Sequence, residues 1–524
     1  MKKVLLFLIA VGFFIGAFIT IKNNALKSKE NNEVIKEIEN ETYIDELNLP
    51  LIEVDTMNPL FTKNKQVCDI LKLIYEPLFD FDETNKIVPK LASEWLERDD
   101  NTWLIKLNDN AIWHDGKDFS AEDIIFTYDS IKSSETSVYK ENLKNIESIE
   151  KIDNNTIQIN LLSNDDLIFY KLTFPIIPKH YFTNDLYNEL NVVRLCGTGP
   201  YRYTSITDDE KVISLTSNES WWKKESFKLN KIYLHKYATY GEAIKAFKST
   251  EIDVISTTMS SWQKKFGAIG INSYMFESSE YETIIANTQK NILNESSVRR
   301  MILSIINSEN IVESIYNGNG KVSSYPNVST SYLNFTKENR NHDIEKAKQL
   351  LINAGWNNLS GLWKKQINGK LYVLEFDLLV DSENEQKIEI ANMIVENLKE
   401  IGIKTNIIKV KTSEYHKRIE KGNFELALAT LNLDMDTDVI ELVESNSIKN
   451  FARYNNFEID NIIAQINKEN LDQSYMKIQE IYKNECPYIG MYYKCNNLLT
   501  NKSVKGNINP TSWNVYHGIT GWCK

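Results

Sequence analysis

The 524-residue chain is short of the side chains that build most catalytic and metal sites. It contains six histidines and five cysteines, and it has no His-Glu-x-x-His, Gly-x-Ser-x-Gly or Cys-x-x-Cys pattern. The first of these motifs holds catalytic zinc and the second presents a nucleophilic serine. No Cys/His cluster has the spacing of a zinc site either. The sequence therefore predicts a protein that is not an enzyme and that needs no metal or cofactor.

Two short segments resemble catalytic motifs only superficially. Gly318-Asn319-Gly320-Lys321 lacks the earlier glycine of a phosphate-binding loop, and Val322 stands where that loop needs Ser or Thr for magnesium. His114-Asp115-Gly116 lies between Trp113 and Phe119, and an Asp-Gly pair in this setting is typical of a tight turn between extended segments. We interpret both segments as structural.

The cysteines are too few for a disulfide framework, and their number is odd. Cys486 and Cys495 are spaced so that a hairpin would bring them together, and the sequence leaves their pairing open. Otherwise the thiols are expected to be buried or incidental.

Excess positive charge is absent as well. Asp and Glu total 72 against 60 Lys and Arg, which gives a net charge of -12. Such a chain is poorly suited to bind nucleic acid, whose phosphates require concentrated positive charge. Hydrophobic residues make up 42% and charged residues 25%, which is typical of globular domains, and the length predicts about three of them.

The N-terminus carries the longest apolar run of the chain. Lys2 and Lys3 precede 18 uncharged residues, Val4 to Ile21, and a polar, charged segment follows at 22–41. The run is long for a signal peptide and long enough to span a bilayer. We predict an uncleaved signal-anchor at 1–21 and a tether at 22–41, so that the rest of the chain lies at the extracytoplasmic face of the cell membrane. A cleaved signal peptide, which would give a secreted protein, is the alternative.

The body of the chain reads as α/β. Asn368-Gly369 is the pair that a type I′ hairpin turn requires. Apolar residues then recur at helical spacing from Ile388 to Ile401, and Gly402 follows as a C-cap. Together with the segments around them, these features predict a βαβαβ series and a mostly parallel sheet: strand Val373–Val380, helix Ile388–Ile401, strand Ile403–Val410, helix Thr412–Lys421 and strand Phe424–Thr430.

Other elements are predicted nearer the N-terminus. Thr102–Leu107 and Ile149–Leu162 read as antiparallel strands and hairpins. Ser120-x-x-Asp123 is similar to a capping box that opens a helix, and Thr239-x-x-Glu242 opens another.

Several weak motifs form a specific pattern when they are read in order. They are Tyr75-Glu76-Pro77-Leu78-Phe79, Val88-Pro89-Lys90-Leu91-Ala92-Ser93-Glu94-Trp95, Trp103, Trp113 to Asp123, Gly197-Thr198-Gly199-Pro200-Tyr201, Trp221-Trp222, Pro487-Tyr488-Ile489 and Val504-Lys505-Gly506. In this order and spacing, over about residues 45–520, they resemble the family 5 extracellular solute-binding proteins. Those proteins are the oligopeptide, dipeptide and nickel receptors of ABC importers.

The resemblance implies a two-lobed periplasmic-binding-protein-like fold of the class II type, with an extra domain inserted in the first lobe. Transferred to this chain, lobe 1 is expected at 42–75, 196–285 and 496–524, the inserted domain at 76–195 and lobe 2 at 286–495. Ligand is expected between the lobes, which close on it and dock on a permease. A monomer without cofactor is implied.

The resemblance also implies ligand contacts. In peptide-binding members, an aspartate on the loop after a strand of the second lobe pairs with the ligand's α-amino group. Asp434 matches that position best, with Asp436 and Asp438 as neighbours and a solvated acidic loop as the alternative. Those members usually carry Gly-Trp where this chain has Thr430-Leu431, so peptide specificity is in question.

Three further positions are expected near the ligand. Asn58 lies in the loop after the first strand, which runs beside the cleft in this family. Asn287 and Gln289 follow the strand Tyr281–Ala286, near the expected hinge. The glycines Gly197 and Gly199 suit a crossover between domains better than ligand contact.

The predicted function is therefore capture of a small ligand, first of all a short peptide, for an ABC-type permease. A ligand sensor with the same fold, or a receptor for another solute such as a metal chelate or a sugar, remains as an alternative. A hydrolase with a dispersed site is the alternative from another class.

Overall fold

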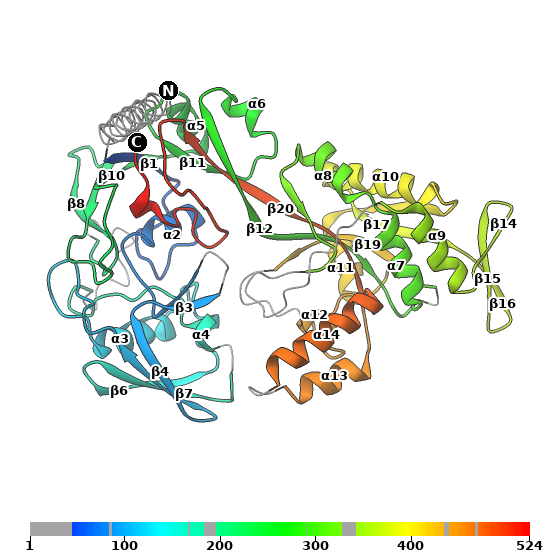
Figure 1. The fold of residues 1–524 in the computed structure, drawn as a ribbon, viewed down its shortest axis with the longest axis horizontal. Coiled ribbons are helices and arrows are strands. Elements are labelled where there is room, and N and C mark those ends of the chain that lie inside the picture. Colours follow the sequence, from blue (N-terminus) through cyan, green and yellow to red (C-terminus); the bar gives the residue numbers. More distant parts are fainter. Residues whose placement is uncertain are drawn as a thin grey trace, which may run out of the picture.

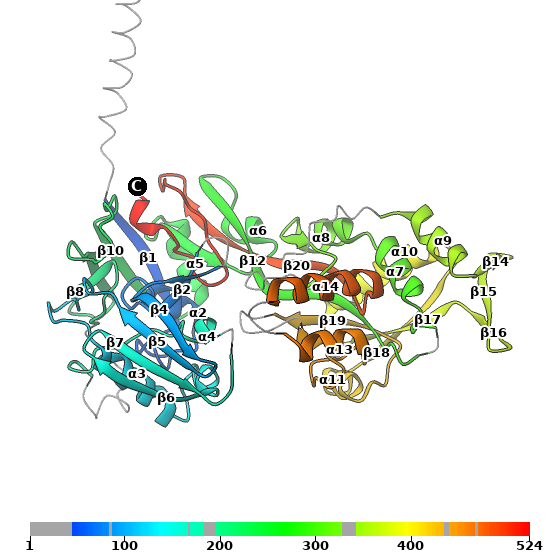
Figure 2. The same cartoon turned by 60° about the horizontal axis from the view of Figure 1, so that its bottom comes forward.

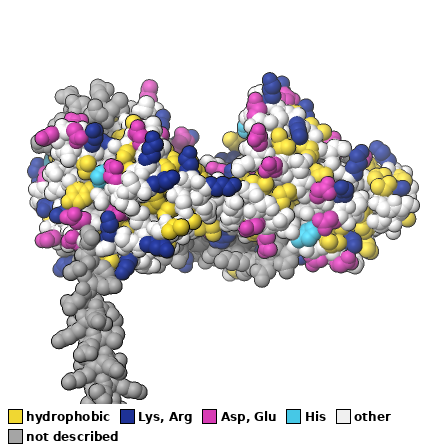
Figure 3. Space-filling model, turned by 90° about the horizontal axis from the view of Figure 1, so that it is seen from above, with side chains coloured by type: hydrophobic (Ala, Val, Ile, Leu, Met, Phe, Trp, Pro, Cys, Tyr) yellow, Lys and Arg dark blue, Asp and Glu magenta, His cyan; other side chains and the backbone are white. Residues whose placement is uncertain are grey.

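The computed structural model describes residues 45–82, 86–165, 168–182, 195–290, 292–326, 342–433, 440–466 and 470–524. Two units lie end to end along the long axis of the molecule (Figure 1). Two long antiparallel strands, β12 (Ile271–Ala286) and β20 (Tyr488–Asn501), run from one unit into the other. Space-filling atoms show a narrow waist where these strands cross (Figure 3).

The first unit is built on a four-stranded sheet. Its order is β1-β10-β9-β8, with β1 parallel to β10 and the other pairs antiparallel. The bounds are β1 Glu46–Ile52, β8 Tyr201–Ile206, β9 Val212–Ser217, β10 Lys231–Tyr237 and β11 Val254–Thr257, with helices α2 Lys65–Leu71, α5 Tyr240–Lys248 and α6 Trp262–Phe266. Thr239 caps α5, as its sequence predicts, by accepting the Glu242 N–H at 3.3 Å.

A second sheet of four strands, in the order β4-β5-β7-β6, is wholly antiparallel. The capping box at Ser120 and Asp123 is present at the start of α3, and β5 coincides with the predicted strand. The bounds are β2 Phe79–Phe81, β3 Ile87–Pro89, β4 Ala92–Asp99, β5 Thr102–Leu107, α3 Ala121–Ser133, β6 Ile146–Asp153, β7 Thr156–Leu161 and α4 Ile168–Lys171. This sheet shares one hydrophobic core with the first unit.

The second unit is a sheet with a core on each face. Helices α7, α8, α9 and α10 contribute to one core, and α11 to α14 contribute to the other. The helices are α7 Ser296–Ile305, α8 Ser308–Tyr316, α9 Ile344–Asn353, α10 Glu385–Lys399, α11 Thr412–Lys421, α12 Ile440–Val443, α13 Phe457–Ala464 and α14 Leu471–Glu485. The α/β class predicted from the sequence is confirmed.

The sheet of this unit extends along β12 and β20 into the first unit, where β11 pairs with β20. Its order is β11-β20-β12-β19-β17-β18, and β13 (Gly320–Val322) also pairs with β20. The predicted βαβαβ series is present as β17 (Glu375–Asp381), α10, β18 (Lys404–Val410), α11 and β19 (Leu426–Asn432). These three strands are parallel. The pairs that involve β12 and β20 are antiparallel, so the sheet is mixed rather than mostly parallel.

A small three-stranded sheet projects from the far end of this unit (Figure 1). It consists of β14 (Asn357–Leu359), β15 (Leu362–Ile367) and β16 (Lys370–Val373). Asn368 and Gly369 have φ angles of 51° and 79°, which confirms the type I′ turn.

The chain passes between the units within β12, not at its end. The register of β12 against β20 shifts between Glu277 and Tyr281, and residues from Tyr281 to Ala286 pack in the cores of the second unit. The change of unit thus falls within β12. No disulfide joins any of the five cysteines, all of which lie among the described residues, so Cys486 and Cys495 are not paired with each other.

In the part of the chain that the structure describes, no helix is both long and apolar enough to cross a bilayer. The Val4–Ile21 run lies outside the described residues.

Candidate functional site

The carboxyl ends of the parallel strands in the second unit point toward the waist. Asn432, the last residue of β19, pairs with Glu280 of β12, beside the register shift where β12 leaves for the first unit. Figure 2 shows β19 running in that direction. Ligands of open α/β sheets bind outside the carboxyl ends of the strands, so this edge is the candidate site.

A buried ion cluster lies at this edge. Glu282 of β12 is fully buried, and its Oε2 lies 2.5 Å from Lys387 Nζ at the start of α10. Its Oε1 accepts the Thr430 hydroxyl at 2.5 Å and lies 3.4 Å from Lys494 Nζ. Lys494 also pairs with Glu280 at 2.6 Å. The cluster therefore joins β12, β19, β20 and α10 beside the waist.

The charges in this cluster support one another. Burial alone would raise the pKa of Glu282, but Lys387 and Lys494 outweigh that effect and hold its pKa below the ordinary value. Burial lowers the pKa of Lys494, and the nearby Glu282 and Glu280 more than reverse this. Burial lowers the pKa of Lys387, and Glu282 only partly offsets this, but their direct contact at 2.5 Å favours the ion pair, so two carboxylates face two ammonium groups. The role of the cluster is to hold the second-unit ends of the crossing strands.

Sequence reasoning did not find this cluster, although it left two signals. Glu282 stands beside the apolar run that ends β12. Lys387 lies on the buried stripe of α10 with Ile390, Ala391 and Ile394. A charged residue on a buried face needs a partner. The identity of that partner was not readable, because Lys494 comes from a strand more than 200 residues away in sequence.

Asn287 and Gln289 lie at the far end of β12 from the waist. The Asn287 amide donates to the carbonyls of Gly422 and Phe424 at 2.8 and 3.2 Å, and the side chain is buried. Gln289 donates to the Arg453 carbonyl at 3.0 Å. Asn287 thus fixes the loop before β19, away from the hinge where the sequence placed both residues.

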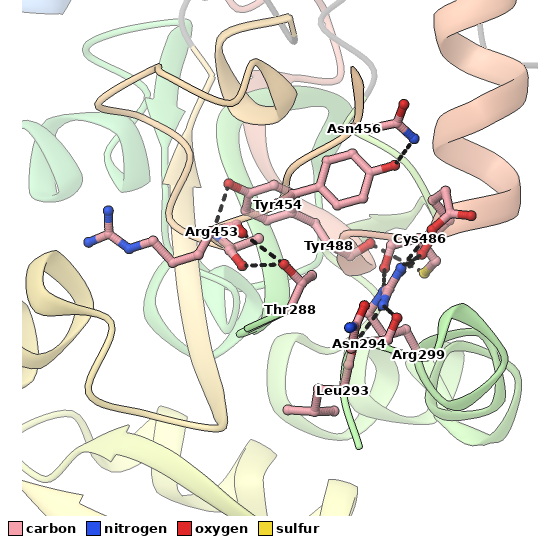
Figure 4. Close-up of polar contacts among 11 residues, drawn as sticks. Thr288, Leu293, Asn294, Arg299, Arg453, Tyr454, Asn456, Cys486 and Tyr488 are labelled. Atoms are coloured by element: carbon pink, nitrogen blue, oxygen red, sulfur yellow. Dashed lines mark hydrogen bonds and ion pairs between the residues drawn. The ribbon is translucent and has the colours of Figure 1, made fainter. Parts of the chain in front are cut away.

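Gln289 borders a polar cavity of about 360 Å³. Figure 4 shows the residues around it, with Thr288 donating to the Arg453 carbonyl at 2.9 Å. The Arg299 guanidinium is buried and donates to the carbonyls of Leu293, Asn294, Glu485 and Cys486. These hydrogen bonds use the donors of the Arg299 guanidinium. Arg299 therefore caps the C-terminal carbonyls of α14. The remaining lining residues are Asn294, Tyr454, Asn455, Asn456 and Glu485.

Asn58 shapes the turn after β1. Its side-chain oxygen accepts the Leu60 N–H at 3.1 Å, and its own N–H donates to the Thr56 hydroxyl at 3.1 Å. The side chain is 4% exposed. These contacts account for an asparagine at this position as a turn former.

Asp434, with Asp436 and Asp438, lies outside the described residues. The chain is described up to Leu433, whose N–H donates to the Ser279 carbonyl at 2.8 Å beside the register shift of β12. Leu433, the last described residue before them, thus lies at the waist.

The sequence motifs of the first unit meet around one buried carboxylate. Glu76 accepts the Thr198 hydroxyl at 3.0 Å and the indole N–H groups of Trp221 and Trp222 at 3.2 and 2.8 Å. Burial raises the pKa of Glu76, and Lys90 and the three donors only reduce that rise. Residues from three distant motifs thus hold one acid inside the unit, which is an architectural role.

Gly197 and Gly199 lie against the chain just before Glu76. A Cβ on Gly197 would lie 1.9 Å from the Ile74 carbonyl oxygen, and one on Gly199 would lie 2.7 Å from it. His114 bridges the two glycines, since its Nε2 donates to the Gly199 carbonyl at 3.0 Å and its Nδ1 accepts the Gly197 N–H at 3.2 Å. Burial lowers the pKa of His114 to about 4. His114 is therefore a neutral structural residue, and Gly116 with φ 85° forms the predicted turn.

No group of three His, Cys, Asp or Glu side chains among the described residues is placed to hold a metal ion. The described part of the site consists of turn formers and paired charges, which suits binding and positioning.

Comparison with known proteins shows which proteins this chain resembles. The model of the bacterial extracellular solute-binding proteins, family 5 Middle, matches residues 86–447. The oligopeptide-binding protein AppA of Bacillus subtilis is 24% identical over 487 residues, which is 87% of each chain. Heme-binding protein A of Haemophilus influenzae is 24% identical over 488 residues, covering 85% of this chain and 86% of its own length.

The fold is also that of solved structures. The periplasmic murein tripeptide binding protein MppA, in an unliganded open form, superposes with a TM-score of 0.76 at 20% identity. The match covers 90% of this chain and 96% of MppA. At this identity the likeness establishes the fold.

Proposed function

Since the chain belongs to the bacterial extracellular solute-binding proteins, family 5, we propose that it captures a small solute, first of all a short peptide, between its two units and delivers it to an ABC-type permease. The observation that supports this most strongly is the waist. Among the described residues, β12 and β20 are the segments that pass between two separately packed units, and the parallel strands β17, β18 and β19 all run toward that junction. A ligand that touches both units favours the closed arrangement, because closure adds contacts that the open form lacks.

The test is capture of the native ligand followed by closure. The full chain, purified without refolding, is analysed by native mass spectrometry and any retained molecule is identified. That molecule, at about 100 times its dissociation constant, should stabilise the fold by about 2.7 kcal/mol. X-ray scattering should show a smaller radius of gyration. Tight binding at an unchanged radius of gyration would contradict capture between the units.

For a peptide ligand, Asp434 is the proposed anchor of the α-amino group. A buried ammonium needs a charged partner, and losing that partner costs about 3–5 kcal/mol. Asp434→Asn should therefore weaken binding of the peptide by two to four powers of ten, since about 1.4 kcal/mol is a factor of ten. Asp436→Asn and Asp438→Asn are the matched controls and should change affinity far less.

An N-acetylated copy of the same peptide tests the contact directly. Acetylation should weaken binding to the unmodified protein and add little to the effect of Asp434→Asn. If the two effects simply add, the groups do not meet. If neither change matters, the solute is held in another way.

A non-peptide solute is the second candidate. It is favoured by the resemblance to heme-binding protein A, which is as close in identity as AppA. Mass spectrometry of the retained molecule separates the two candidates. If the chain retains a ligand but no permease and ATPase genes lie next to its own gene, the finding would instead support a ligand sensor.

The N-terminal run supports a membrane attachment. We expect Val4–Ile21 to hold the full chain in the membrane fraction, with the body at the extracytoplasmic face. Recovery of a secreted form that starts after residue 22 would contradict the anchor and leave solute capture untouched.

A further inference from the structure

One face of the first unit combines unpaired positive charge with an exposed apolar tip. The face is formed by α5, α6 and the loop that joins α6 to β12, and we call it the α5–α6 face. It lies on the upper side of the unit in Figure 1. In the view from above, dark-blue Lys and Arg side chains gather on the first unit beside the waist (Figure 3).

Four lysines carry the charge of this face. Lys245 and Lys248 lie on α5, and Lys264 and Lys265 lie on α6, all of them exposed. Among the described residues none of the four forms an ion pair, whereas the exposed Lys65 and Lys399 each pair with an acidic residue of their own helix. Their charge is thus available to a partner.

A hollow of about 490 Å³ lies among three of these lysines. It is lined by Thr239, Gly241, Glu242, Ile244, Lys245, Lys248 and Lys265. Glu242 is the acidic group in this hollow, and its carboxylate accepts the Ala238 N–H at 3.1 Å. The nearby Glu251 accepts the Tyr237 hydroxyl at 2.8 Å. Three ammonium groups around one engaged carboxylate leave the hollow suited to phosphate-bearing groups.

The apolar tip is Ile269. Its side chain is 97% exposed, more than any other large hydrophobic residue among those described. Gly267 and Gly270, with φ angles of 89° and 80°, bracket the tip, and Ala268 beside it is also exposed. An aliphatic side chain held out on a tight loop beside lysines is the arrangement by which peripheral proteins contact lipid.

The chain enters the structure next to this face. β1 begins at Glu46, and the Asp253 N–H, just beyond α5, donates to the Asn48 carbonyl at 2.8 Å. The preceding residues include the uncharged run from Val4 to Ile21. If the Val4–Ile21 run attaches the chain to the membrane, the α5–α6 face is brought close to the lipid surface.

From these observations we infer that the α5–α6 face docks on the anionic phosphate headgroups of the lipid bilayer, with Ile269 entering the interface. The lysines of this face are complementary in charge to the lipid phosphates. The chain as a whole has a net charge of -12, so anionic lipid would repel it unless such a positive face is turned toward the membrane. Stable attachment of a protein to a membrane commonly combines two elements, such as one apolar anchor and one basic patch. The inference goes beyond solute capture and does not depend on the identity of the solute.

The test places a probe at the tip. The full-length Ile269→Cys chain is labelled with an environment-sensitive dye and reconstituted into vesicles of phosphatidylcholine, with or without about one third phosphatidylglycerol. Ile448→Cys is the matched control, since Ile448 is 92% exposed on the second unit. The chain without an added cysteine gives the background from Cys68, which is half-buried.

We expect the dye at position 269 to report an apolar environment and to be quenched by nitroxide-labelled lipids in the anionic vesicles only. The dye at position 448 should stay in water. High salt should release the tip, because exposed charges are screened. A probe at 269 that stays in water, or that enters both kinds of vesicle equally, would overturn the inference.

Charge removal completes the test. Replacing Lys245, Lys248, Lys264 and Lys265 by Gln should lower the ratio of docked to undocked chain by at least about tenfold. The same replacement at Lys404, Lys409, Lys417 and Lys421, all exposed on the second unit, should leave the ratio unchanged. If inorganic phosphate protects the lysines from acetylation and anionic vesicles do not, the hollow binds a small anion and the docking inference fails. Carbonate extraction reports the Val4–Ile21 anchor separately.

Discussion

Among the described residues, each unit buries one glutamate, and the two are held in opposite ways. Glu76 in the first unit is 1% exposed and accepts hydrogen bonds from neutral side chains, so burial raises its pKa. Glu282 in the second unit is fully buried, but Lys387 and Lys494 hold its pKa below the ordinary value. Burial alone therefore does not decide the charge of an interior acid. The partners decide it, and they come from elements far away in the chain.

The largest effect is expected from Lys387→Met. It leaves Glu282 without its nearest ammonium, and breaking a buried pair costs about 3–5 kcal/mol. Urea unfolding of the purified chain measures the loss. Lys399→Met is the matched control, because Lys399 lies on the same helix but pairs only at the surface, with Glu396, and should cost less than about 1 kcal/mol. Equal losses in the two variants would mean that Glu282 does not depend on Lys387.

Acid should weaken the first unit through His114. The pKa of His114 is lowered to about 4 from 6.5, so the unfolded chain binds the proton first as pH falls. The neutral imidazole thus contributes stability that is fully present above pH 6.5 and is lost between pH 6.5 and about 4. The shift of 6.5 - 4 = 2.5 corresponds to about 3 kcal/mol.

Unfolding by urea at several pH values between 4 and 7.5 checks this window. His114→Asn should flatten the profile between pH 4 and 6.5. His416→Asn, at an exposed position on α11, should leave it unchanged. A flat profile in the unmodified protein would contradict a neutral, buried His114.

A smaller effect is expected at Glu76. Trp222→Phe removes one of three donors to the carboxylate, the one at 2.8 Å, while Thr198 and Trp221 still donate. A hydrogen bond to a charged group contributes about 1.5–3 kcal/mol. Since the pKa of Glu76 is raised above 4.5, its proton stabilises the fold at low pH, and that contribution falls as pH rises through the raised pKa.

A double-mutant cycle with Glu76→Gln isolates this contact. The cost of Trp222→Phe should shrink in the Glu76→Gln background, because the charged acceptor is gone. Equal costs in both backgrounds would show that the indole contributes by packing alone.

The smallest effect concerns the projecting hairpin of the second unit. Gly369→Ala places a side chain at φ 79°, which costs about 1–2 kcal/mol. Gly241→Ala is the control, because Gly241 lies within α5 and alanine there should stabilise the helix by about 0.5–1 kcal/mol. Unfolding by urea should shift in opposite directions. A shift in the same direction would contradict the type I′ turn.

Local rules accounted for much of the second unit. The predicted bounds of α11 are those observed, and α10 ends before Gly402 as the C-cap predicts. The last strand runs from Leu426 to Asn432, two residues later than predicted. Its bounds depend on pairing with β12 and β17, which lies outside any local window.

The candidate site was less predictable. Asn58 and Asn287 were expected near ligand, and the structure shows their amides bonded to the backbone of nearby turns. Asparagine serves both purposes, and sequence spacing does not separate them. Asp434 as the amine anchor stays a prediction.

The sequence by itself determined the order of the motifs, and with it the family, because the glycines, tryptophans and turn residues are set by local backbone needs. It also determined the hairpin turn and the helix caps, whose partners lie within a few residues. Only the tertiary structure decided that Glu76 meets Trp222 and that Glu282 meets Lys387 and Lys494. Those contacts join residues more than a hundred positions apart, and their geometry arises only when whole units pack.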